Sequence, residues 1–429
     1  MSRRLIVYED RHWRTLRPLT DLLPVPALAF GASTLAQRWL AAARLPLFAL
    51  EARAGAMAGW HAPPLLETSP AGANDEVVVV NAAALPGPWF AGALESRAPA
   101  LWLGEGRVAG ARLPLAMLRG AIGRGDDFEL VLLGLALPSL LVEAEFVTFP
   151  WDLIARNADA IAADLAGSPA AARGTVHRLA CLEAPERIVI EEGASVGPFA
   201  VLDASPGPIR IGRGARIEPH THVLGPCVVG DGTQLLGGAV RGSTFGPECR
   251  IAGEVEASIW QGYANKRHHG FVGHSMLAEW VNLGALTTTS DLKNNYGEVR
   301  AWVDGRERET RASKVGAFVG AHVKTGIGTL LPTGATVGTG ANLFGGGRFA
   351  PKSVPSFAWW DGDAFAEHEL ERCVATARIA ASRRARELTP AAEAALRALH
   401  AATVGERRSF AGSEPATATP RTRTPGARA

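Results

Sequence analysis

The sequence predicts a two-part protein in which an α/β front domain is joined to a parallel β-helix and a helical segment follows. Three observations support this fold class. A small aliphatic residue recurs every six residues through the middle of the chain, short β-branched runs flank a helical stretch near the N-terminus, and residues 361–405 are rich in Ala, Glu, Arg and Leu. A six-residue period is typical of a β-helix, whereas strands and helices repeat at two and 3.6 residues.

The front domain is predicted over residues 1–150. Leu5 to Tyr8 and Val77 to Val80 are short apolar runs that suit buried parallel strands. Between them, Ser33 is placed to cap a helix that runs through Trp39. The order strand, helix, strand favours a parallel sheet. A linker helix is predicted after Pro150, within residues 151–180.

The β-helix is predicted over residues 181–360. Each hexad would form one flat face with its aliphatic residue pointing inward, and three faces would close one coil. After a break, the rhythm returns at Ile327. The inward residues predicted before and after the break are Ile190, Val196, Leu202, Ile211, Ile217, Val223, Val229, Leu235, Ile327, Leu331, Val337 and Leu343.

The C-terminal part divides into helices and a tail. Residues 361–405 are predicted to form one or two helices with a break at Pro390. The Pro, Thr, Ala and Arg bias beyond them predicts a disordered tail over residues 406–429.

The overall composition narrows the function. Lys plus Arg number 44 and Asp plus Glu 42, a balance that argues against binding to nucleic acid or a membrane surface through bulk charge. The four cysteines show no CxxC spacing, so reduced thiols are expected and no metal site is indicated. No stretch has the length of a signal peptide core or a membrane span, so we expect a cytoplasmic protein.

Two stretches resemble known enzymes. The segment Leu16 to Thr20, followed by Pro24, Pro26 and Gly31, resembles the opening of sugar-1-phosphate nucleotidyltransferases. The segments 268–273 (HHGFVG), 281–285 (VNLGA) and 294–297 (NNYG) are similar to the acetyltransferase half of the bifunctional N-acetylglucosamine-1-phosphate uridyltransferase and glucosamine-1-phosphate acetyltransferase. The separation of His268 from Asn282 fits that family's pattern.

The front domain departs from this resemblance where nucleotidyl transfer takes place. Relatives bind the triphosphate with a glycine loop, a lysine and an acidic magnesium ligand. This chain has residues 9–15 (EDRHWRT) in place of the loop, Val25 in place of the lysine, and Asn81 where relatives carry the aspartate. We therefore expect the fold without an assured activity, although Arg17, with Arg11 and Arg14, remains a candidate to clamp a sugar phosphate.

The back half keeps more of the residues that the resemblance implies. His268 is the candidate general base, because a neutral imidazole accepts a proton near physiological pH. Asn282 is the second candidate catalytic residue. His269 or His274 could replace His268 if the register is shifted. By the same resemblance, Phe271, Asn294, Asn295 and Tyr296 would bind substrate, and Gly284, Ala285, Ala321 and Thr333 would line the coenzyme A arm.

Substitutions in the back half leave the acceptor open. Glu256 stands where the family has a lysine, and an acid there would repel a sugar phosphate. A basic cluster of Arg306, Arg308, Arg311 and Lys314 could contact the phosphates of coenzyme A, or could be a solvated loop face.

The resemblance therefore implies a nucleotidyltransferase-like α/β domain followed by a left-handed hexapeptide-repeat β-helix. It implies a homotrimer that transfers an acetyl group from acetyl-CoA to an amino sugar phosphate. Two alternatives stay open. The front domain could make a sugar nucleotide, which would require Mg²⁺ and a nucleoside triphosphate. The chain could instead be an inactive trimeric scaffold that binds a sugar phosphate or sugar nucleotide.

Overall fold

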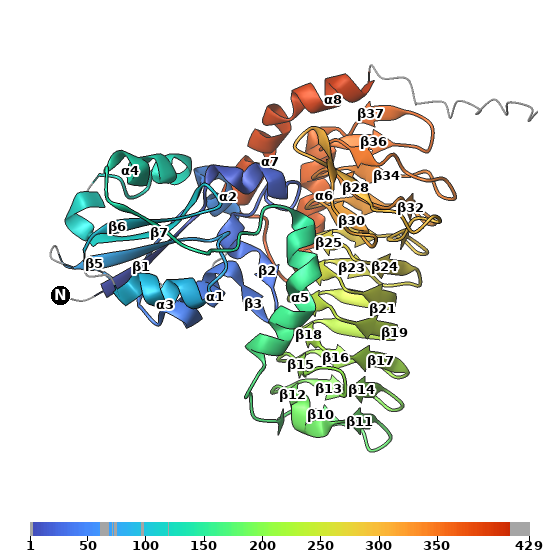
Figure 1. The fold of residues 1–429 in the computed structure, drawn as a ribbon. Helices are drawn as coiled ribbons and strands as arrows, with labels where there is room; N and C mark the ends of the chain where they lie inside the picture. The colour runs from blue at the N-terminus through green and yellow to red at the C-terminus, as the bar shows by residue number, and fades with distance from the viewer. Residues whose placement is uncertain are drawn as a thin grey trace, which may run out of the picture.

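The computed structural model describes residues 3–60, 68–70, 72, 75–95, 98–118 and 120–411. Figure 1 shows a front domain lying against one side of a tall stack of short strands, with the C-terminal helices over the upper part of the stack. The predicted order of parts is confirmed.

The front domain is built on one six-stranded sheet. β1 is parallel to β4 and β5, whereas β7 is antiparallel to β5 and β6. The predicted strands are therefore confirmed as β1 and β5, but only this half of the sheet is fully parallel. In sheet order the strands are β4 (Leu47–Glu51), β1 (Arg3–Tyr8), β5 (Glu76–Asn81), β7 (Arg107–Pro114), β6 (Ala100–Gly104) and β8 (Ser139–Leu141).

The first helix begins one residue later than predicted. Thr34, not Ser33, is the N-cap, and it forms a capping box with Gln37. Ser33 instead belongs to a small hairpin. The remaining elements of the domain are η1 (Arg11–Leu16), η2 (Val25–Ala27), β2 (Ala29–Phe30), β3 (Ser33–Thr34), α1 (Leu35–Ala43), α2 (Ala54–Gly59), α3 (Pro88–Glu95), η4 (Leu115–Leu118), η5 (Gly125–Asp127) and α4 (Phe128–Gly134).

The predicted linker helix is α5 (Pro150–Asp164), which starts with Pro150 in its first turn. It runs along the stack beside the front domain (Figure 1). The buried Asn157 fixes it there, because its side chain accepts a hydrogen bond from Gly31 N (2.9 Å) and donates one to Thr244 Oγ1 (3.1 Å).

The stack is a left-handed parallel β-helix with three faces, as predicted. The first face holds β10 (Thr175–Val176), β13 (Ser195–Val196), β16 (Arg216–Ile217), β19 (Gln234–Arg241), β21 (Arg250–Glu256), β23 (Asn265–Lys266), β26 (Asn282–Leu283), β31 (Lys324–Thr325), β34 (Asn342–Leu343) and β36 (Ala358–Trp360). The second holds β11 (Cys181–Glu183), β14 (Val201–Asp203), β17 (Thr221–Leu224), the second halves of β19 and β21, β24 (Phe271–Gly273), β27 (Thr288–Thr289) and β32 (Leu330–Leu331). The third holds β9 (Ala171–Ala172), β12 (Ile188–Ile190), β15 (Ile209–Ile211), β18 (Cys227–Val229), β20 (Thr244–Phe245), β22 (Ile259–Trp260), β25 (Met276–Leu277), β30 (Ala317–Val319), β33 (Ala335–Val337) and β35 (Ser353–Val354).

The predicted inward residues form the core of the stack with one exception. All are buried except Ile327, which is 71% exposed. Ile327 lies at a corner between two glycines, and Thr325 takes the inward place. The hexad rhythm is interrupted between Leu235 and Ile327, yet the coils continue through β21 to β26, within the predicted range of the β-helix. An insertion that carries β28 (Arg300–Val303) and β29 (Arg306–Glu309) lies between β27 and β30. It interrupts the six-residue period before the last coils.

The C-terminal segment forms α6 (Leu370–Ser382), α7 (Pro390–Ala402) and α8 (Val404–Ala411). The break at Pro390 is confirmed, since this proline starts α7. The predicted disorder from residue 406 begins too early, because α8 continues to Ala411 and packs on β37 (Phe365–Glu367). The rest of the predicted tail, residues 412–429, lies outside the described residues. Within the described ranges, no helix is long and apolar enough to cross a bilayer.

Candidate active site on the stack

The predicted base lies at an exposed corner of the stack. His268 follows β23, and no hydrogen-bond partner for its side chain exists within the described residues. The same corner continues in the coils above, because Leu286 N donates to His269 O (2.8 Å) and Gly328 N donates to Ala285 O (2.8 Å). His268 and Ala285 therefore lie on one edge of the prism.

A buried lysine holds this corner from inside. Lys266 is 0% exposed, and its Nζ donates to Ala252 O (2.7 Å) and His268 O (2.9 Å). Burial lowers the pKa of Lys266 to about 8. Sequence reasoning did not predict that this lysine is buried. The available signal was its place, directly above the inward Ile251 of the coil below.

Asn282 lies one coil above Asn265, in register on the first face. Its Oδ1 accepts a hydrogen bond from Asn265 Nδ2 at 2.6 Å. No hydrogen bond joins Asn282 to His268 in the described part of the chain. The two predicted catalytic residues thus belong to neighbouring positions of the stack without direct contact.

A histidine–aspartate pair lies at the next corner. His274 Nδ1 is 2.7 Å from Asp291 Oδ2, and both side chains are largely buried. Burial opposes ionisation of Asp291, but the hydrogen bond from His274 prevails and lowers the pKa of that carboxyl. Asp291 orients the imidazole, as in other histidine–carboxylate pairs. Sequence reasoning named His274 only as a substitute and missed Asp291.

The acid that replaces the family lysine is neutralised locally. Glu256 pairs with Arg241 (2.7 Å) and with Lys314 (3.7 Å). Burial raises the pKa of Glu256, yet the Arg241 hydrogen bond outweighs it and the net shift is downward. Its carboxylate therefore repels an anionic ligand less than the sequence suggests. Phe271 begins β24 on the same face and is half-buried.

The loop that contains Asn294, Asn295 and Tyr296 is exposed. Tyr296 is 75% exposed, and Asn295 Oδ1 accepts a hydrogen bond from Gly297 N (3.1 Å), which closes a turn. The structure does not bring these three residues to His268 within one chain. Their predicted role in binding substrate remains a prediction.

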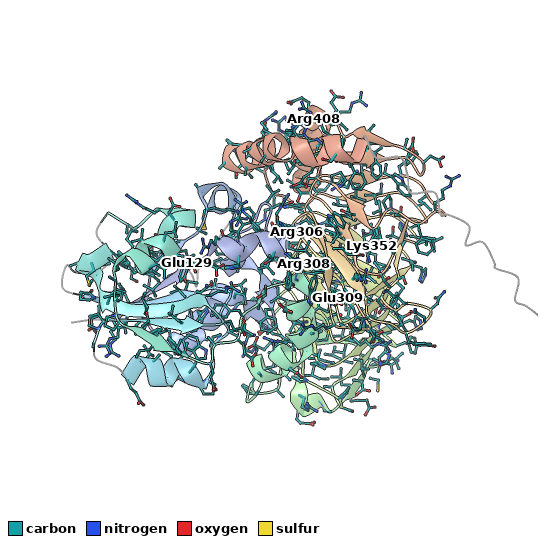
Figure 2. The ribbon with its side chains drawn as sticks, turned by 45° about the horizontal axis from the view of Figure 1, so that its top comes forward. Glu129, Arg306, Arg308, Glu309, Lys352 and Arg408 are labelled. Carbon is teal, nitrogen blue, oxygen red and sulfur yellow. The ribbon has the colours of Figure 1, made fainter. Side chains whose placement is uncertain are left out.

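The predicted basic cluster lies on the insertion and is mixed with acids. In β29, Arg306 and Arg308 alternate with Glu307 and Glu309, and Glu307 pairs with Lys352 (3.4 Å). Figure 2 shows Arg306, Arg308, Glu309 and Lys352 gathered in one region of the stack. The alternation makes this strand a less positive surface than the arginines alone indicate.

The four predicted cofactor residues separate into different surroundings. Ala285 lies at the His268 corner, and Gly284 is required by coil packing, since a Cβ there would meet Gly326 O at 2.6 Å. Thr333 is half-buried near the base of the insertion. Ala321 is 5% exposed, in the apolar cluster that joins the stack to the front domain, so it does not line an open groove in the chain.

Exposed apolar side chains follow the His268 corner upward. Leu286, Ile327 and Phe344 are 57%, 71% and 63% exposed. We call these three residues the apolar edge. Large apolar side chains that line up on an exposed edge are typical of contact surfaces.

In the front domain, side chains of the chain itself fill the region where the resemblance would put the triphosphate and its magnesium ion. Asp10 follows β1 and is 1% exposed; Arg107 Nη2 lies 2.7 Å from its Oδ2, and Asn81 Nδ2 donates to the same oxygen at 2.8 Å. Burial raises the pKa of Asp10, but hydrogen bonds from His12, Asn81 and Arg107 together lower it to about 2. Glu129, marked in Figure 2 within the front domain, is also buried nearby.

The loop of residues 9–15, which stands in place of the glycine loop, is also held by contacts within the chain. Glu9 accepts hydrogen bonds from Val25 N (2.6 Å) and from Arg53 Nη1 (2.6 Å), and Arg53 lies over the Trp13 ring at 4.0 Å. Arg17 does not face this region. It pairs with Asp21 (2.6 Å) and with Glu406 of α8 (2.7 Å), so two carboxylates already neutralise its charge. Its predicted role as a phosphate clamp stays a prediction.

The front domain is similar in sequence to a known family. Residues 5–169 match the family model described as sugar nucleotidyl transferase. The front domain is therefore similar to that family. The matched residues cover the sheet, α1 to α4 and the linker helix α5.

Two relatives have names that describe them as bifunctional. A bifunctional sugar-1-phosphate nucleotidylyltransferase/acetyltransferase of Sulfurisphaera tokodaii is 36% identical over 93 residues, which are 22% of this chain and 23% of that protein. The bifunctional protein GlmU of Paracidovorax citrulli is 30% identical over 182 residues, or 40% of this chain and 33% of that protein. The matched part thus spans a third or less of these relatives.

A solved structure of a UDP-N-acetylglucosamine acyltransferase from Campylobacter jejuni overlaps 45% of the chain and 73% of its own chain. The identity is 12% and the TM-score is 0.27, values too low to support an argument about fold or function.

Proposed function

We propose that the stack transfers an acetyl group from acetyl-CoA to the amine of an amino sugar phosphate, at the corner that carries His268. The relatives with bifunctional nucleotidylyltransferase and acetyltransferase names support this reaction class. The observation that carries the proposal is the free imidazole of His268, exposed at an edge that Ala285 and the apolar edge continue.

The chemistry needs few groups. The amine nitrogen of the acceptor would attack the thioester carbonyl while His268 accepts a proton from that amine. The carbon–sulfur bond then breaks, and coenzyme A leaves as the thiol. Backbone N–H groups at the corner would stabilise the developing oxyanion. Lys266 would fix the position of His268 by holding its carbonyl. Asn282, Phe271 and the 294–296 loop remain candidates to orient the acceptor.

The nucleotidyltransferase domain is proposed to be inactive. Mg²⁺ needs a free carboxylate oxygen, but Asp10 is bound by Arg107 and Asn81. The residues present therefore do not fit the metal and triphosphate of the family reaction. The closed loop around Glu9 supports the same conclusion.

The proposal is tested by thiol release from acetyl-CoA with a panel of amino sugar phosphates. We expect His268→Ala to lower kcat/KM by roughly 100-fold or more, the usual contribution of a general base. His269→Ala is the matched control, because His269 is an exposed neighbour and should leave the rate unchanged. An equal loss in His274→Ala with none in His268→Ala would move the base to the His274–Asp291 pair.

Two other results would revise the proposed function, the first for the front domain and the second for the stack. Pyrophosphate release from a nucleoside triphosphate with a sugar 1-phosphate and Mg²⁺ would favour an active front domain. Absence of both reactions, together with binding of coenzyme A or a sugar nucleotide, would favour the scaffold.

A further inference from the structure

A second corner of the stack, away from His268, carries glycine in the lower coils and large ring side chains in the middle coils, where the front domain and the C-terminal helices pack. In the lower coils this corner is glycine with a left-handed backbone, at Gly214 (φ 61°) and Gly232 (φ 66°). In the middle coils the same conformation is held by Tyr263, Trp280 and His322, with φ of 53°, 63° and 59°. Large side chains disfavour this conformation, so these three must be held by their surroundings.

The three rings form a ladder along the stack. Tyr263 and Trp280 stack at 4.5 Å with planes 12° apart, and Trp280 and His322 lie 6.4 Å apart with planes 5° apart. Arg386, between α6 and α7, lies over the outer face of the Tyr263 ring at 5.9 Å. The ladder thus ends against the C-terminal helices.

The ladder forms one wall of a cavity of about 190 Å³ at the junction of all three parts of the molecule. The remaining wall mixes apolar and polar side chains. Its apolar part comes from Ala27 and Trp60 of the front domain, Pro247 of the stack, and Ala377, Ala381, Leu388 and Ala392 of the C-terminal segment. Its polar part comes from Thr34, Gln261, Glu279, Arg386, Glu387 and Thr389.

Two polar groups in this wall lack partners. Glu279 has no hydrogen bond or ion pair with any described residue, and His322 is 8% exposed with an unpaired, buried Nδ1. Burial raises the pKa of Glu279 to about 7 and lowers that of His322 to about 3. No ion pair joins the nearby Lys324 to Glu279 in the described part of the chain; its Nζ donates instead to Trp280 O (2.8 Å) and His322 O (3.1 Å).

We propose that this cavity binds a small organic amine, whose ammonium group pairs with Glu279 and whose ring or hydrocarbon body fills the apolar wall. A half-buried carboxylate without a partner among the described residues is costly, and a ligand cation would offset that cost. The volume of about 190 Å³ suits a single six-membered ring. The site is separate from the His268 corner and does not depend on acyl transfer.

Calorimetry with cyclohexylamine and cyclohexanol tests the site, because the two ligands share a ring and differ in charge. We expect the amine to bind at least roughly tenfold more tightly, the scale of a charge-assisted hydrogen bond. Glu279→Gln should abolish that preference. His268→Ala should bind the amine as the wild type does, so failure of the acyl-transfer proposal would leave this result intact.

A second variant tests the ladder. Trp280→Gly restores the residue type of the lower coils, so the corner should fold, while the cavity loses a wall and the affinity falls. Phe199→Gly is the matched control, since Phe199 also has a left-handed backbone (φ 60°) and stacks on His220. Equal binding of amine and alcohol, no binding of either, or an unchanged preference in Glu279→Gln would overturn the proposal.

Discussion

At the scale of single residues, Lys266 shows how one side chain can interrupt a repeat and support a site. It occupies an inward position, directly above Ile251, in a stack whose other inward residues are mostly aliphatic. Two carbonyl acceptors satisfy part of its hydrogen-bonding capacity. One of them belongs to His268, so the cost of burying the charge is linked to the position of the proposed base.

The shifted pKa of Lys266 predicts a pH-dependent stability. Its pKa falls from 10.5 to about 8 in the folded chain, so between these values the unfolded chain binds more protons. The free energy of unfolding of the wild type should therefore rise with pH relative to Lys266→Met, by roughly 3 kcal/mol over that range. Urea unfolding of both proteins across pH 8 to 10.5 measures the difference.

Ile251→Met is the control for the lysine substitution, because it exchanges one apolar inward residue for another. Its difference from the wild type should not change with pH. A pH-independent difference between the wild type and Lys266→Met would contradict the lowered pKa of the buried lysine.

At the scale of elements, Arg17 joins three segments that are distant in sequence. Its partner Asp21 also accepts a hydrogen bond from Thr339 Oγ1 of the stack (2.9 Å), and its other partner Glu406 lies on α8. Arg17 therefore belongs to the packing of η1, the upper coils and α8.

This packing predicts unequal effects of two substitutions. Arg17→Ala would leave the Asp21 carboxylate, whose side chain is 0% exposed, without its cation and lower the free energy of unfolding by roughly 3 kcal/mol. Glu406→Gln changes a side chain that is 41% exposed and should cost less than about 1 kcal/mol. Chemical denaturation of both variants measures this. Unchanged stability in Arg17→Ala, with weaker binding of a sugar phosphate, would favour the predicted ligand-binding role.

The elements also show what the sequence can and cannot predict. The hexad period and the β-branched runs predicted the faces of the stack and the strands β1 and β5, because they record burial at fixed spacing. The coils at β21 to β26 lie within the predicted β-helix, but they show no hexad rhythm, because an inward position is held by Lys266 instead of an aliphatic residue. The sequence predicted only part of the Asp10 site. It showed the missing glycines and Asn81, but it could not show the Arg107–Asp10 ion pair, because the folded sheet brings together two residues that are distant in sequence.

At the scale of the whole molecule, the proposed site is incomplete in a single chain. No hydrogen bond joins the 294–296 loop to His268 within the described residues, and the apolar edge beside His268 is open to solvent. A second copy that covered this edge would bury Leu286, Ile327 and Phe344 and could bring its own loop to the corner. These observations support the predicted homotrimer and an active site between copies.

Charge at the apolar edge should separate the copies. We expect the wild type to have the mass of a trimer by light scattering and Ile327→Asp to have that of a monomer, because a carboxylate cannot be buried there without a partner. Leu141→Asp is the matched control, since Leu141 is 89% exposed on β8 of the front domain and should leave the assembly intact. Ile327→Asp should also lose thiol release although His268 is unchanged, since the neighbouring copy would no longer complete the corner. A wild-type monomer that still cleaves acetyl-CoA would show instead that one chain holds the whole site.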